Sequence, residues 1–567
     1  MEALVQAALL RHSTAYKGLE PGVLAELVDV AAKAGTDTGA LAASFDRFMT
    51  INRFGASGVT LEDVEAFAAS ECSASAKALA EKTNLTGGQR SATTPSQRIS
   101  PYLHTKTAAS AQARAAVHSP LPSLARESGT SSTPLRPTEA SAQLVSSHNP
   151  GLATCAAGAT LAAIRILGTP LPSEARFGTD SLEDRAALLE QRIRAVEVEA
   201  AGQDGAEAHP VGSACQDATL FVGRICCDTE EGRLNPQSLL LEGSQALSGG
   251  ARVRLDVSRL PAFRLFPGQV VSLRGTNPSG HCIIAAELCG PREPDAKTGS
   301  SHPAAPTSIV LAAGPYCCPE NLEYAPLHAL LEHCRRLRPA HLLLAGPWVD
   351  EAHPLLAGGL VDETFQSIFQ TRFLATVEAF SGACPGTRVL LLPSPRDLHL
   401  PPVFPAPAPR LAAPATPALT PLPNPTTIML EDAGLALGCT SVDWLMAVGR
   451  EELVRLDSGA PAPDRLAQLA THVLEQRSYF PLFPPPPGLP LDTRRARAAL
   501  ALPDQAPAVL VLPSDLAPFA RPAPGGATLC INPGRAAKGA GAGTFAHLCA
   551  APGERACDAL RCDILRI

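Results

Sequence analysis

The stretch HLLLAGPWVD, residues 341–350, holds the clearest fold signal in the sequence. Its first half is a run of apolar residues, which is typical of a short strand buried on both faces of a parallel sheet. A Gly-Pro turn follows, and then the acidic residue Asp350. We therefore predict a buried strand at 341–345 that ends in a tight turn.

Similar strand and turn units lie on both sides of this stretch. Further apolar strands are predicted at 308–313, 388–392, 508–512 and 527–531, with amphipathic helices around 327–337 and 365–369. Strands that alternate with helices predict a layered α/β domain, here at 305–567. Two proline-rich segments, 401–425 and 481–490, interrupt this domain and are predicted to be surface loops.

The turns after these strands are where an α/β sheet places its chemistry. A two-metal hydrolase needs carboxylate and imidazole ligands there. Proline side chains cannot bind a metal, and prolines stand where ligands would be needed, at Pro315, Pro347 and Pro533. The remaining candidates, Asp350, Asp397 and His399, are interpreted as turn hydrogen-bonding residues and surface groups rather than as a one-metal site. No catalytic residue, metal or cofactor is expected.

Residues 218–290 read as short alternating strands separated by turns. This pattern favours a small, partly closed barrel of the OB type. Such barrels often bind single-stranded nucleic acid by stacking bases on aromatic side chains. Only a few aromatic residues are present, chiefly Phe221, Phe263 and Phe266, so a role in protein contacts is an equal alternative.

The first 150 residues divide into two parts. Residues 1–75 predict short amphipathic helices and a small helical domain, whereas 76–150 are rich in Ser, Thr, Ala and Pro and predict a disordered linker. A connecting segment, 151–217, leads into the barrel. Four linker sites precede a proline and are candidate phosphorylation sites: Thr94, Ser100, Ser119 and Thr133. The alternative is that any such linker contains these dipeptides by chance.

The overall composition sets limits on function. The chain has 567 residues, 54 of them proline, and a net charge of -7, which argues against a protein whose main task is to grip a phosphate backbone. It contains 16 cysteines but no Cys-x-x-Cys pair, so a zinc ribbon is not indicated. A secretory signal and an apolar run of about 18 residues are both missing, so we expect a soluble intracellular protein.

The order of strands and turns resembles the calcineurin-like metallophosphoesterase fold. Active members of that family carry Asp-x-His, Gly-Asp, Gly-Asn-His, a lone His and Gly-His-x-His in these turns, and the first and last of these sets are absent here. An OB-type barrel before an inactivated phosphoesterase domain is similar to the B subunits of eukaryotic replicative DNA polymerases. Several stretches resemble the B-subunit family of DNA polymerase alpha–primase: AGPY at 313–316, AGPWVD at 345–350, LPSPRDLH at 392–399, QRSYFPLFPP at 476–485 and CINPGR at 530–535.

The resemblance implies a noncatalytic accessory subunit in the nucleus. Its implied partners are the C-terminal domain of the polymerase alpha catalytic subunit, the primase subunits, and other replication factors that bind the N-terminal domain. Contact with DNA would be mainly indirect, and no membrane contact is expected. Three alternatives remain: a B subunit of polymerase delta or epsilon, an active metallophosphoesterase, and an independent single-strand binder that acts through the barrel.

Overall fold

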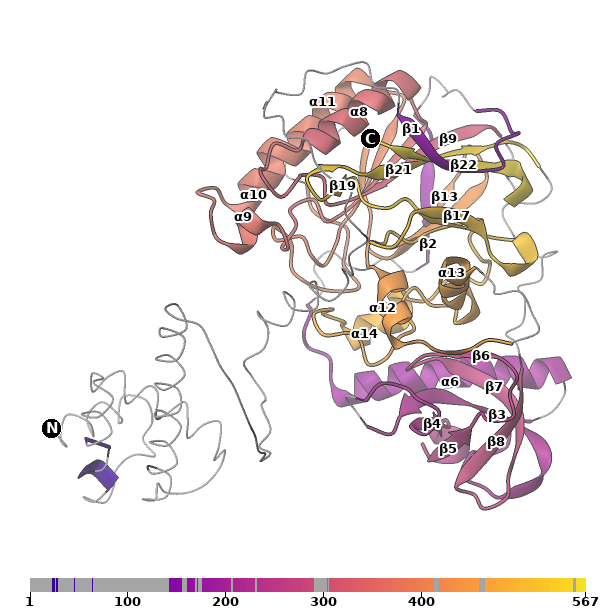
Figure 1. The fold of residues 1–567 in the computed structure, drawn as a ribbon. Coiled ribbons are helices and arrows are strands. Elements are labelled where there is room, and N and C mark those ends of the chain that lie inside the picture. Colours follow the sequence, from indigo (N-terminus) through magenta and orange to yellow (C-terminus); the bar gives the residue numbers. More distant parts are fainter. Residues whose placement is uncertain are drawn as a thin grey trace, which may run out of the picture. The chain divides into compact units, whose positions relative to one another are not determined.

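The fold was analysed in a computed structural model. It describes residues 142–154, 161–168, 171, 176–204, 207–229, 232–289, 303, 305–411, 418–457, 464–553 and 557–567, with a few isolated positions before 142. Apart from those positions, the helical domain predicted at 1–75 and most of the predicted linker lie outside the described residues, as do the four candidate phosphorylation sites. Figure 1 labels the elements of the described part.

Residues 215–289 form a closed five-stranded barrel. Its strands are β3 (Cys215–Cys227), β4 (Leu239–Glu242), β5 (Arg252–Asp256), β7 (Val270–Asn277) and β8 (Cys282–Cys289). They close in the order β3-β4-β5-β8-β7, which in barrel numbering is 1-2-3-5-4. The β5–β8 pair is parallel and the other pairs are antiparallel. A partly closed Greek-key barrel of five strands is the OB architecture, so this prediction is confirmed.

Alternating side chains fill the barrel. Leu239 and Leu241 of β4 point inward with Val253 and Leu255 of β5, and all four are nearly or fully buried. This period-two burial is what a strand with one face on the core requires. The short helix α7 (Gln245–Ser248) joins β4 to β5 and is capped by the Ser244 side chain, which accepts from the Leu247 N–H group.

Two sheets form the α/β part of the structure. The seven-stranded sheet has the order β1 (Gln143–His148), β22 (Leu560–Arg566), β21 (Thr544–Ala550), β9 (Thr307–Ala313), β10 (His341–Ala345), β11 (Arg388–Leu392) and β12 (Leu419–Pro421). The six-stranded sheet has the order β17 (Phe519–Pro522), β18 (Leu529–Asn532), β16 (Val509–Val511), β14 (Leu435–Cys439), β13 (Thr426–Leu430) and β2 (Ile164–Leu167). Strands β9 to β12 are parallel, and so are β14, β16 and β18.

The two sheets pack face to face, with helices outside them. Leu343 of β10 lies in the core between the sheets, whereas its neighbours Leu342 and Leu344 lie in a second core beneath the helices on the far side. Those helical elements are α8 (Ala325–Leu337), α9 (Pro354–Ala357), α10 (Phe365–Ile368), the π-helical turn η2 (Phe369–Leu374) and α11 (Ala375–Ala383). Strand β10 is therefore buried on both faces, as its apolar run predicts.

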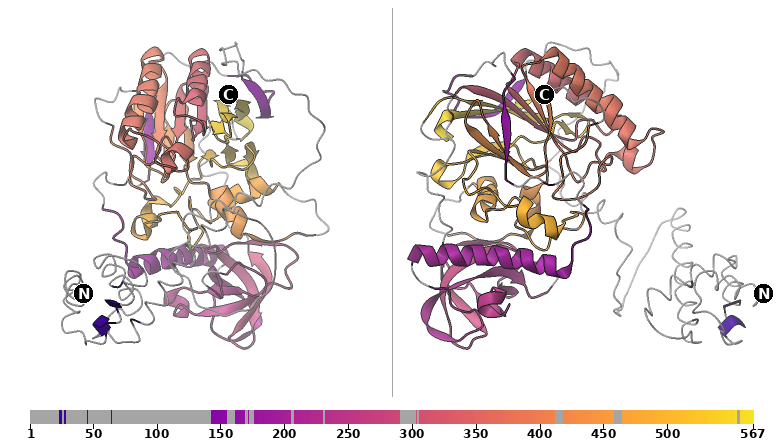
Figure 2. Two further views of the ribbon diagram at one scale, coloured as in Figure 1. Left: turned by 60° about the vertical axis from the view of Figure 1, so that its left-hand side comes forward. Right: turned by 180° about the vertical axis from the view of Figure 1, so that it is seen from behind.

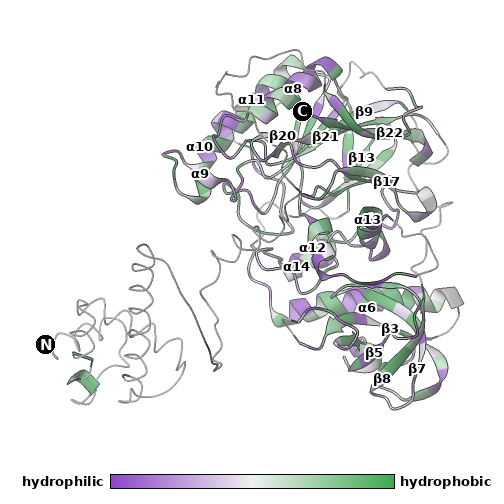
Figure 3. Ribbon diagram, in the orientation of Figure 1, coloured by the Kyte–Doolittle hydropathy of each residue, from purple (hydrophilic) through white to green (hydrophobic). Residues whose placement is uncertain are grey.

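A third core covers the outer face of the six-stranded sheet. It packs Leu510 and Cys530 against α12 (Trp444–Glu451), α13 (Arg465–Glu475) and α14 (Thr493–Ala499). Figure 3 shows the resulting contrast, with the strands largely hydrophobic and the outer helices mixed. The minor elements are β15 (Leu453–Arg455), β6 (Phe263–Leu265), β19 (Ala537–Lys538), β20 (Gly541–Ala542) and the 3₁₀ turns η3 (Pro524–Gly526) and η4 (Cys557–Ala559).

The barrel is joined to the α/β part by several contacts. The helix α6 (Leu182–Asp204) lies along the barrel on the side that faces the α/β part, as Figures 1 and 2 both show. Strand β6 from the barrel region pairs with β15 from the α/β region. The Gln476 amide both accepts from the Val270 N–H group, at 2.8 Å, and donates to the Val270 carbonyl, at 2.9 Å.

Three sequence predictions need correction. Residues 143–148, assigned to the linker, form β1 and pair with β22 at the other end of the chain. The connecting segment supplies β2 and α6 to the folded part. The proline-rich segments are not simply surface loops, because Phe404, Leu422 and Leu482 are at most 1% exposed.

Among the described residues, no helix is both long and apolar enough to span a bilayer.

Candidate functional site

The turns at the ends of the parallel strands meet along one edge where the two sheets come together. Contacts between them are direct: the Ser441 hydroxyl, after β14, donates to the Pro393 carbonyl, after β11, at 2.8 Å. Arg535, after β18, reaches the Gly314 carbonyl, after β9, at 3.4 Å. The candidate residues of the sequence analysis are thus brought to one place, as the parallel topology requires.

The two proline turns of the seven-stranded sheet pack tightly against each other. A methyl group placed on Gly314 would lie 1.9 Å from the Pro347 carbonyl oxygen. A methyl group on Gly346 would lie 2.5 Å from Asp397 Oδ2. Atoms cannot approach so closely, so glycine is required at both positions. Little room therefore remains between the turn that contains Pro315 and the turn that contains Pro347.

Asp397 uses its carboxylate to hold three backbone groups. Its Oδ1 atom accepts from the N–H groups of Trp348, at 2.5 Å, and Val349, at 3.0 Å, and its Oδ2 atom accepts from Ser394 at 2.9 Å. Burial raises the pKa of Asp397 to about 7, against the three hydrogen bonds, which act to lower it. A turn hydrogen-bonding role fits this geometry, but the residue is 2% exposed and is not a surface group.

Asp350 is engaged by a neighbouring turn. Arg396 donates from one nitrogen to both of its carboxylate oxygens, each at 2.7 Å, and the Ala352 N–H group donates to Oδ1 at 3.1 Å. Asp350 is 5% exposed, so the prediction of a surface group is wrong for it as well. Its charge is balanced by a cation from the protein, which is how a buried carboxylate is tolerated.

His399 is buried against aromatic rings. Its ring stacks on that of Phe369, with the centroids 4.0 Å apart and the planes 13° from parallel, and its side chain is 1% exposed. Both ring nitrogens are buried without a hydrogen-bond partner, and burial lowers the pKa of His399 to about 4. Its imidazole is therefore neutral at physiological pH. The sequence prediction of a surface group is wrong for His399. The ring that covers it belongs to Phe369, which lies in a different element of the chain.

Arg535 occupies the last turn, just after Pro533. Its guanidinium pairs with Asp515 at 2.9 Å and with Asp443 at 3.2 Å. The neighbouring Asn532 side chain accepts from the Ser514 and Gly534 N–H groups, both at 2.9 Å. The sequence analysis did not predict the roles of Arg535 and Asp443. The signal that could have indicated them is an arginine, Arg535, in a turn that lacks metal-ligand residues.

The edge as a whole is a network of internal hydrogen bonds and ion pairs. Within the described residues, no three His, Cys, Asp or Glu side chains are grouped so that they could hold a metal ion. The carboxylates face backbone N–H groups or guanidinium groups instead of converging on a shared centre. Such an arrangement fixes the turns of two sheets relative to each other.

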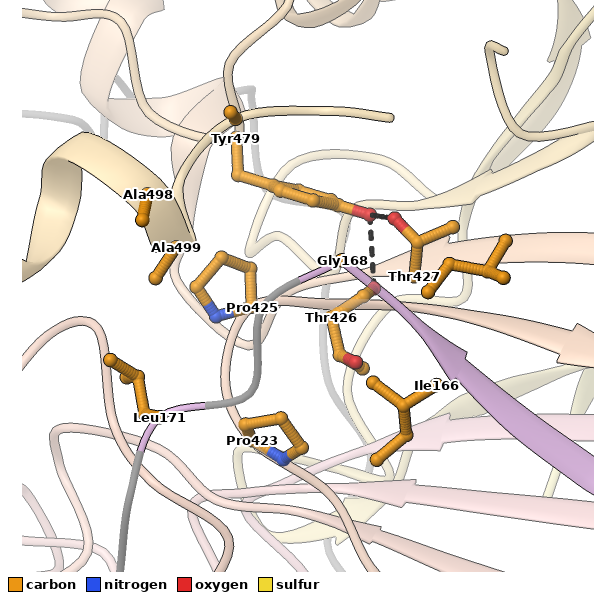
Figure 4. A pocket seen from close by; sticks show the side chains of 12 residues that line it. Ile166, Gly168, Leu171, Pro423, Pro425, Thr426, Thr427, Tyr479, Ala498 and Ala499 are labelled. Atoms are coloured by element: carbon orange, nitrogen blue, oxygen red, sulfur yellow. Dashed lines mark hydrogen bonds between the residues drawn. The ribbon is translucent and has the colours of Figure 1, made fainter. Parts of the chain in front are cut away.

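Other features offer little chemistry. Burial raises the pKa values of the Cys226 and Cys439 thiols to about 12, so these cysteines are unreactive. The cavity in Figure 4, between β2, β13 and α14, measures about 30 Å³, which suits a water molecule rather than a substrate. Tyr479 closes one side of it, with its hydroxyl 2.6 Å from that of Thr427.

The barrel presents none of the three aromatic residues on which base stacking was considered. Phe221, Phe263 and Phe266 are 0%, 5% and 0% exposed. Phe266 leaves the barrel and packs edge-on against Trp444 of α12, with the centroids 5.7 Å apart. These rings therefore stabilise the barrel and its attachment to the α/β part, and they are not available to stack nucleic-acid bases.

Comparisons with known proteins agree with this structure. A family model for the B subunit of DNA polymerases alpha and epsilon matches residues 309–521, and a model for the OB domain of the DNA polymerase alpha B subunit matches residues 191–290. Both matches are to models of the B-subunit family of DNA polymerases. The OB match of this family begins at 191, inside α6, which agrees with the packing of that helix on the barrel.

Relatives in this B-subunit family are named as B subunits of DNA polymerase alpha. The rat protein is 30% identical over 400 residues, which cover 68% of this chain and 64% of the relative. The mouse protein is 29% identical over 405 residues, covering 69% and 65%, and that of Schizosaccharomyces pombe is 33% identical over 365 residues, covering 60% and 61%. The matched regions thus span slightly less than two thirds of these relatives.

Proposed function

We propose that the chain is a noncatalytic accessory B subunit of a DNA polymerase alpha–primase complex. The observation that carries the noncatalytic part is the hydrogen bonding of Asp397, whose carboxylate is used by three backbone N–H groups. The match to an alpha-specific OB domain and the names of the relatives support alpha over delta or epsilon. In this proposal the chain supports replication initiation and lagging-strand primer synthesis as a scaffold.

The α/β part is proposed to be an inactivated calcineurin-like phosphoesterase domain. Two facing sheets covered by helices, with turns at the strand ends, are what a phosphoesterase of that class requires. Proline, glycine and arginine stand in the turns where its ligands would be, at Pro347, Gly534 and Arg535. An active metallophosphoesterase is the enzyme-class alternative, and it would need Asp350 or Asp397 to be released from its present partners.

The proposed partners follow from the family resemblance. The barrel and the α/β part would clasp the C-terminal domain of the catalytic subunit, with the primase subunits in the same complex. The N-terminal domain would recruit other replication factors, and the protein would act in the nucleus. The net charge of -7 and the buried aromatic residues of the barrel support a mainly indirect contact with DNA.

Phosphorylation is proposed as a switch for recruitment. Added phosphate at Thr94, Ser100, Ser119 or Thr133 would bring negative charge to the segment that links the proposed recruitment domain to the proposed scaffold. Replacing all four residues with Ala should change partner affinity and cell-cycle behaviour. Unchanged affinity and behaviour would overturn this part of the proposal.

Co-expression of the full chain with catalytic subunits tests the assignment to alpha. The full chain is expressed together with the catalytic subunit of polymerase alpha or, separately, with that of polymerase epsilon. We expect co-elution with the alpha catalytic subunit in a stable complex on size-exclusion chromatography. Co-elution with the epsilon catalytic subunit alone, or with neither, would reject the assignment.

A further inference from the structure

A groove of about 650 Å³ lies between the first half of α6 and the barrel. The barrel side is formed by residues of β3, β4, β5 and α7, and Phe483 from the α/β part closes one wall. Its volume falls within the range of roughly 300–1,000 Å³ that is usual for binding sites of small molecules and short segments. Figure 2 shows α6 running along the barrel above these strands.

One stripe of α6 faces this groove. Leu182, Arg185, Leu189 and Ile193 all line it, at spacings of three or four residues that place them on one face of a helix. Ile193 is buried at the far end, whereas Leu182 is 78% exposed at the near end. The apolar stripe thus begins in the core and continues into a part of the groove that no described residue covers.

The carboxylates in the groove are already used. Both oxygens of Glu190 accept backbone N–H groups at the start of α7, from Gln245 at 2.7 Å and Ala246 at 3.2 Å. Glu242 pairs with Arg224 and, at 3.2 Å, with Arg252. These two acidic residues therefore satisfy their neighbours in the fold and offer little to a further cation.

The guanidinium groups, in contrast, have unused capacity. The Arg185 guanidinium lies 6.0 Å from the centroid of the Phe483 ring, and its charge is one of the smaller causes that lower the pKa of Asp180. Arg224 is 5% exposed, and its Nε atom is buried without a hydrogen-bond partner.

The aromatic wall brings the apolar and cationic features together. Arg224 and Arg185 both lie over the Phe483 ring, at 5.6 and 6.0 Å from its centroid. This arrangement holds two guanidinium groups beside an apolar surface. A carboxylate placed there would find N–H donors on the exposed Arg185 and a favourable charge from Arg224, and a large apolar side chain beside it would contact Leu182 and Leu189.

We propose that this groove is a docking site for a short segment of a partner protein that carries a carboxylate next to a large apolar side chain. Charge complementarity to Arg185 and Arg224 selects the acidic residue, and the exposed end of the α6 stripe selects the apolar one. A nucleic-acid strand is a poorer occupant, because its charged backbone would lie against the apolar side chains of Leu182 and Leu189.

Fluorescence anisotropy with the full chain tests this site. The probe is a fluorescein-labelled peptide, Gly-Asp-Leu-Leu-Asp-Gly, and the matched probes replace either both Asp with Asn or both Leu with Ser. We expect the first probe to bind about tenfold more tightly than either matched probe. Arg185→Glu should weaken its binding about tenfold or more, and Leu182→Ser should weaken it severalfold.

Arg194→Glu is the matched control, because Arg194 is an exposed arginine of the same helix that does not line the groove. It should leave the peptide affinity unchanged. Equal binding of the three probes, or an affinity unaffected by Arg185→Glu, would overturn the proposal. Binding of a single-stranded oligo-dT of about 20 nucleotides in place of the peptide would also overturn it, if Arg185→Glu abolished that binding. The site would then recognise nucleic acid.

Discussion

Asp397 Oδ1 lies 2.5 Å from the backbone nitrogen of Trp348 and accepts its hydrogen bond. The two residues belong to the turns after β11 and β10, so this bond ties neighbouring turns together. The same carboxylate also accepts from Val349 and Ser394. A residue type that serves as a metal ligand in hydrolases is used here as the acceptor that organises a buried edge.

Asp397→Ala should therefore destabilise the fold. It leaves three backbone N–H groups without their acceptor, and each buried unsatisfied group costs about 1–3 kcal/mol. We expect the free energy of unfolding to fall by about 3 kcal/mol or more, measured by urea denaturation. Asp362→Ala, at an exposed position, is the control and should change it by less than about 0.5 kcal/mol. A loss as small as that of the control would contradict the role of Asp397.

Gly314→Ala tests how closely the proline turns are packed. The added methyl group would meet the Pro347 carbonyl oxygen at 1.9 Å, so the two turns must separate. We expect a clear drop in melting temperature, or insoluble protein. Gly382→Ala is the matched control, since a methyl group there meets nothing within 4 Å and the position lies in α11. It should be neutral or should stabilise the helix by up to about 1 kcal/mol. Equal melting temperatures for the two variants would refute the packing argument.

His399 should make the folded state sensitive to acid. Burial lowers its pKa to about 4, from about 6.5 in the unfolded chain, so the unfolded state binds the extra proton first. Stability is then lost as the pH falls from about 6.5 to about 4, by about 3 kcal/mol in all. His399→Phe removes this contribution and keeps an aromatic ring against Phe369.

The measurement is urea unfolding at several pH values. Unfolding is monitored by tryptophan fluorescence, because the ring centroids of Trp348 and His399 are 6.0 Å apart. His547, whose pKa burial also lowers to about 4, keeps part of the acid sensitivity in the variant. The exposed His328→Phe should behave like the parent. If His399→Phe showed the same pH dependence as the parent, the burial argument would be wrong.

Arg455 should hold the barrel on the α/β part. Its guanidinium donates to the carbonyls of Val257, Ser258 and Leu260 at 3.0–3.1 Å and lies over the Phe263 ring. Arg455→Ala should raise hydrogen exchange in 257–265 about tenfold or more, because local opening then costs less. Arg450→Ala, at an exposed position, should leave exchange unchanged. Equal exchange in both variants would reject Arg455 as a clamp.

The sequence predicted the elements whose signal is local. Apolar runs located β9, β10, β11, β16 and β18 to within about two residues, and alternation located most strands of the barrel. The helix around Leu330 and Cys334 shows the spacing of a one-sided amphipathic helix, and α8 confirms it. The proline turns were also visible, because Pro315 and Pro347 directly follow apolar runs.

The elements that the sequence did not predict depend on distant partners. Strand β1 has a mixed composition, and it becomes a strand only because β22 offers it an edge more than 400 residues away in the chain. Leu422 lies among prolines, yet it is fully buried because the core between the two sheets encloses it. His399 is buried by Phe369, which no local pattern connects to it.

Phosphodiesterase turnover is the most direct test of the central claim, that the strand-end turns are structural and that the protein acts by binding. The purified full chain is incubated with Mn²⁺ and bis(p-nitrophenyl) phosphate, beside the variants Asp350→Asn and Asp397→Asn. We predict a rate at the no-protein background for all three proteins, because each carboxylate is held by partners within the fold. Turnover well above background that either substitution abolishes would contradict the claim.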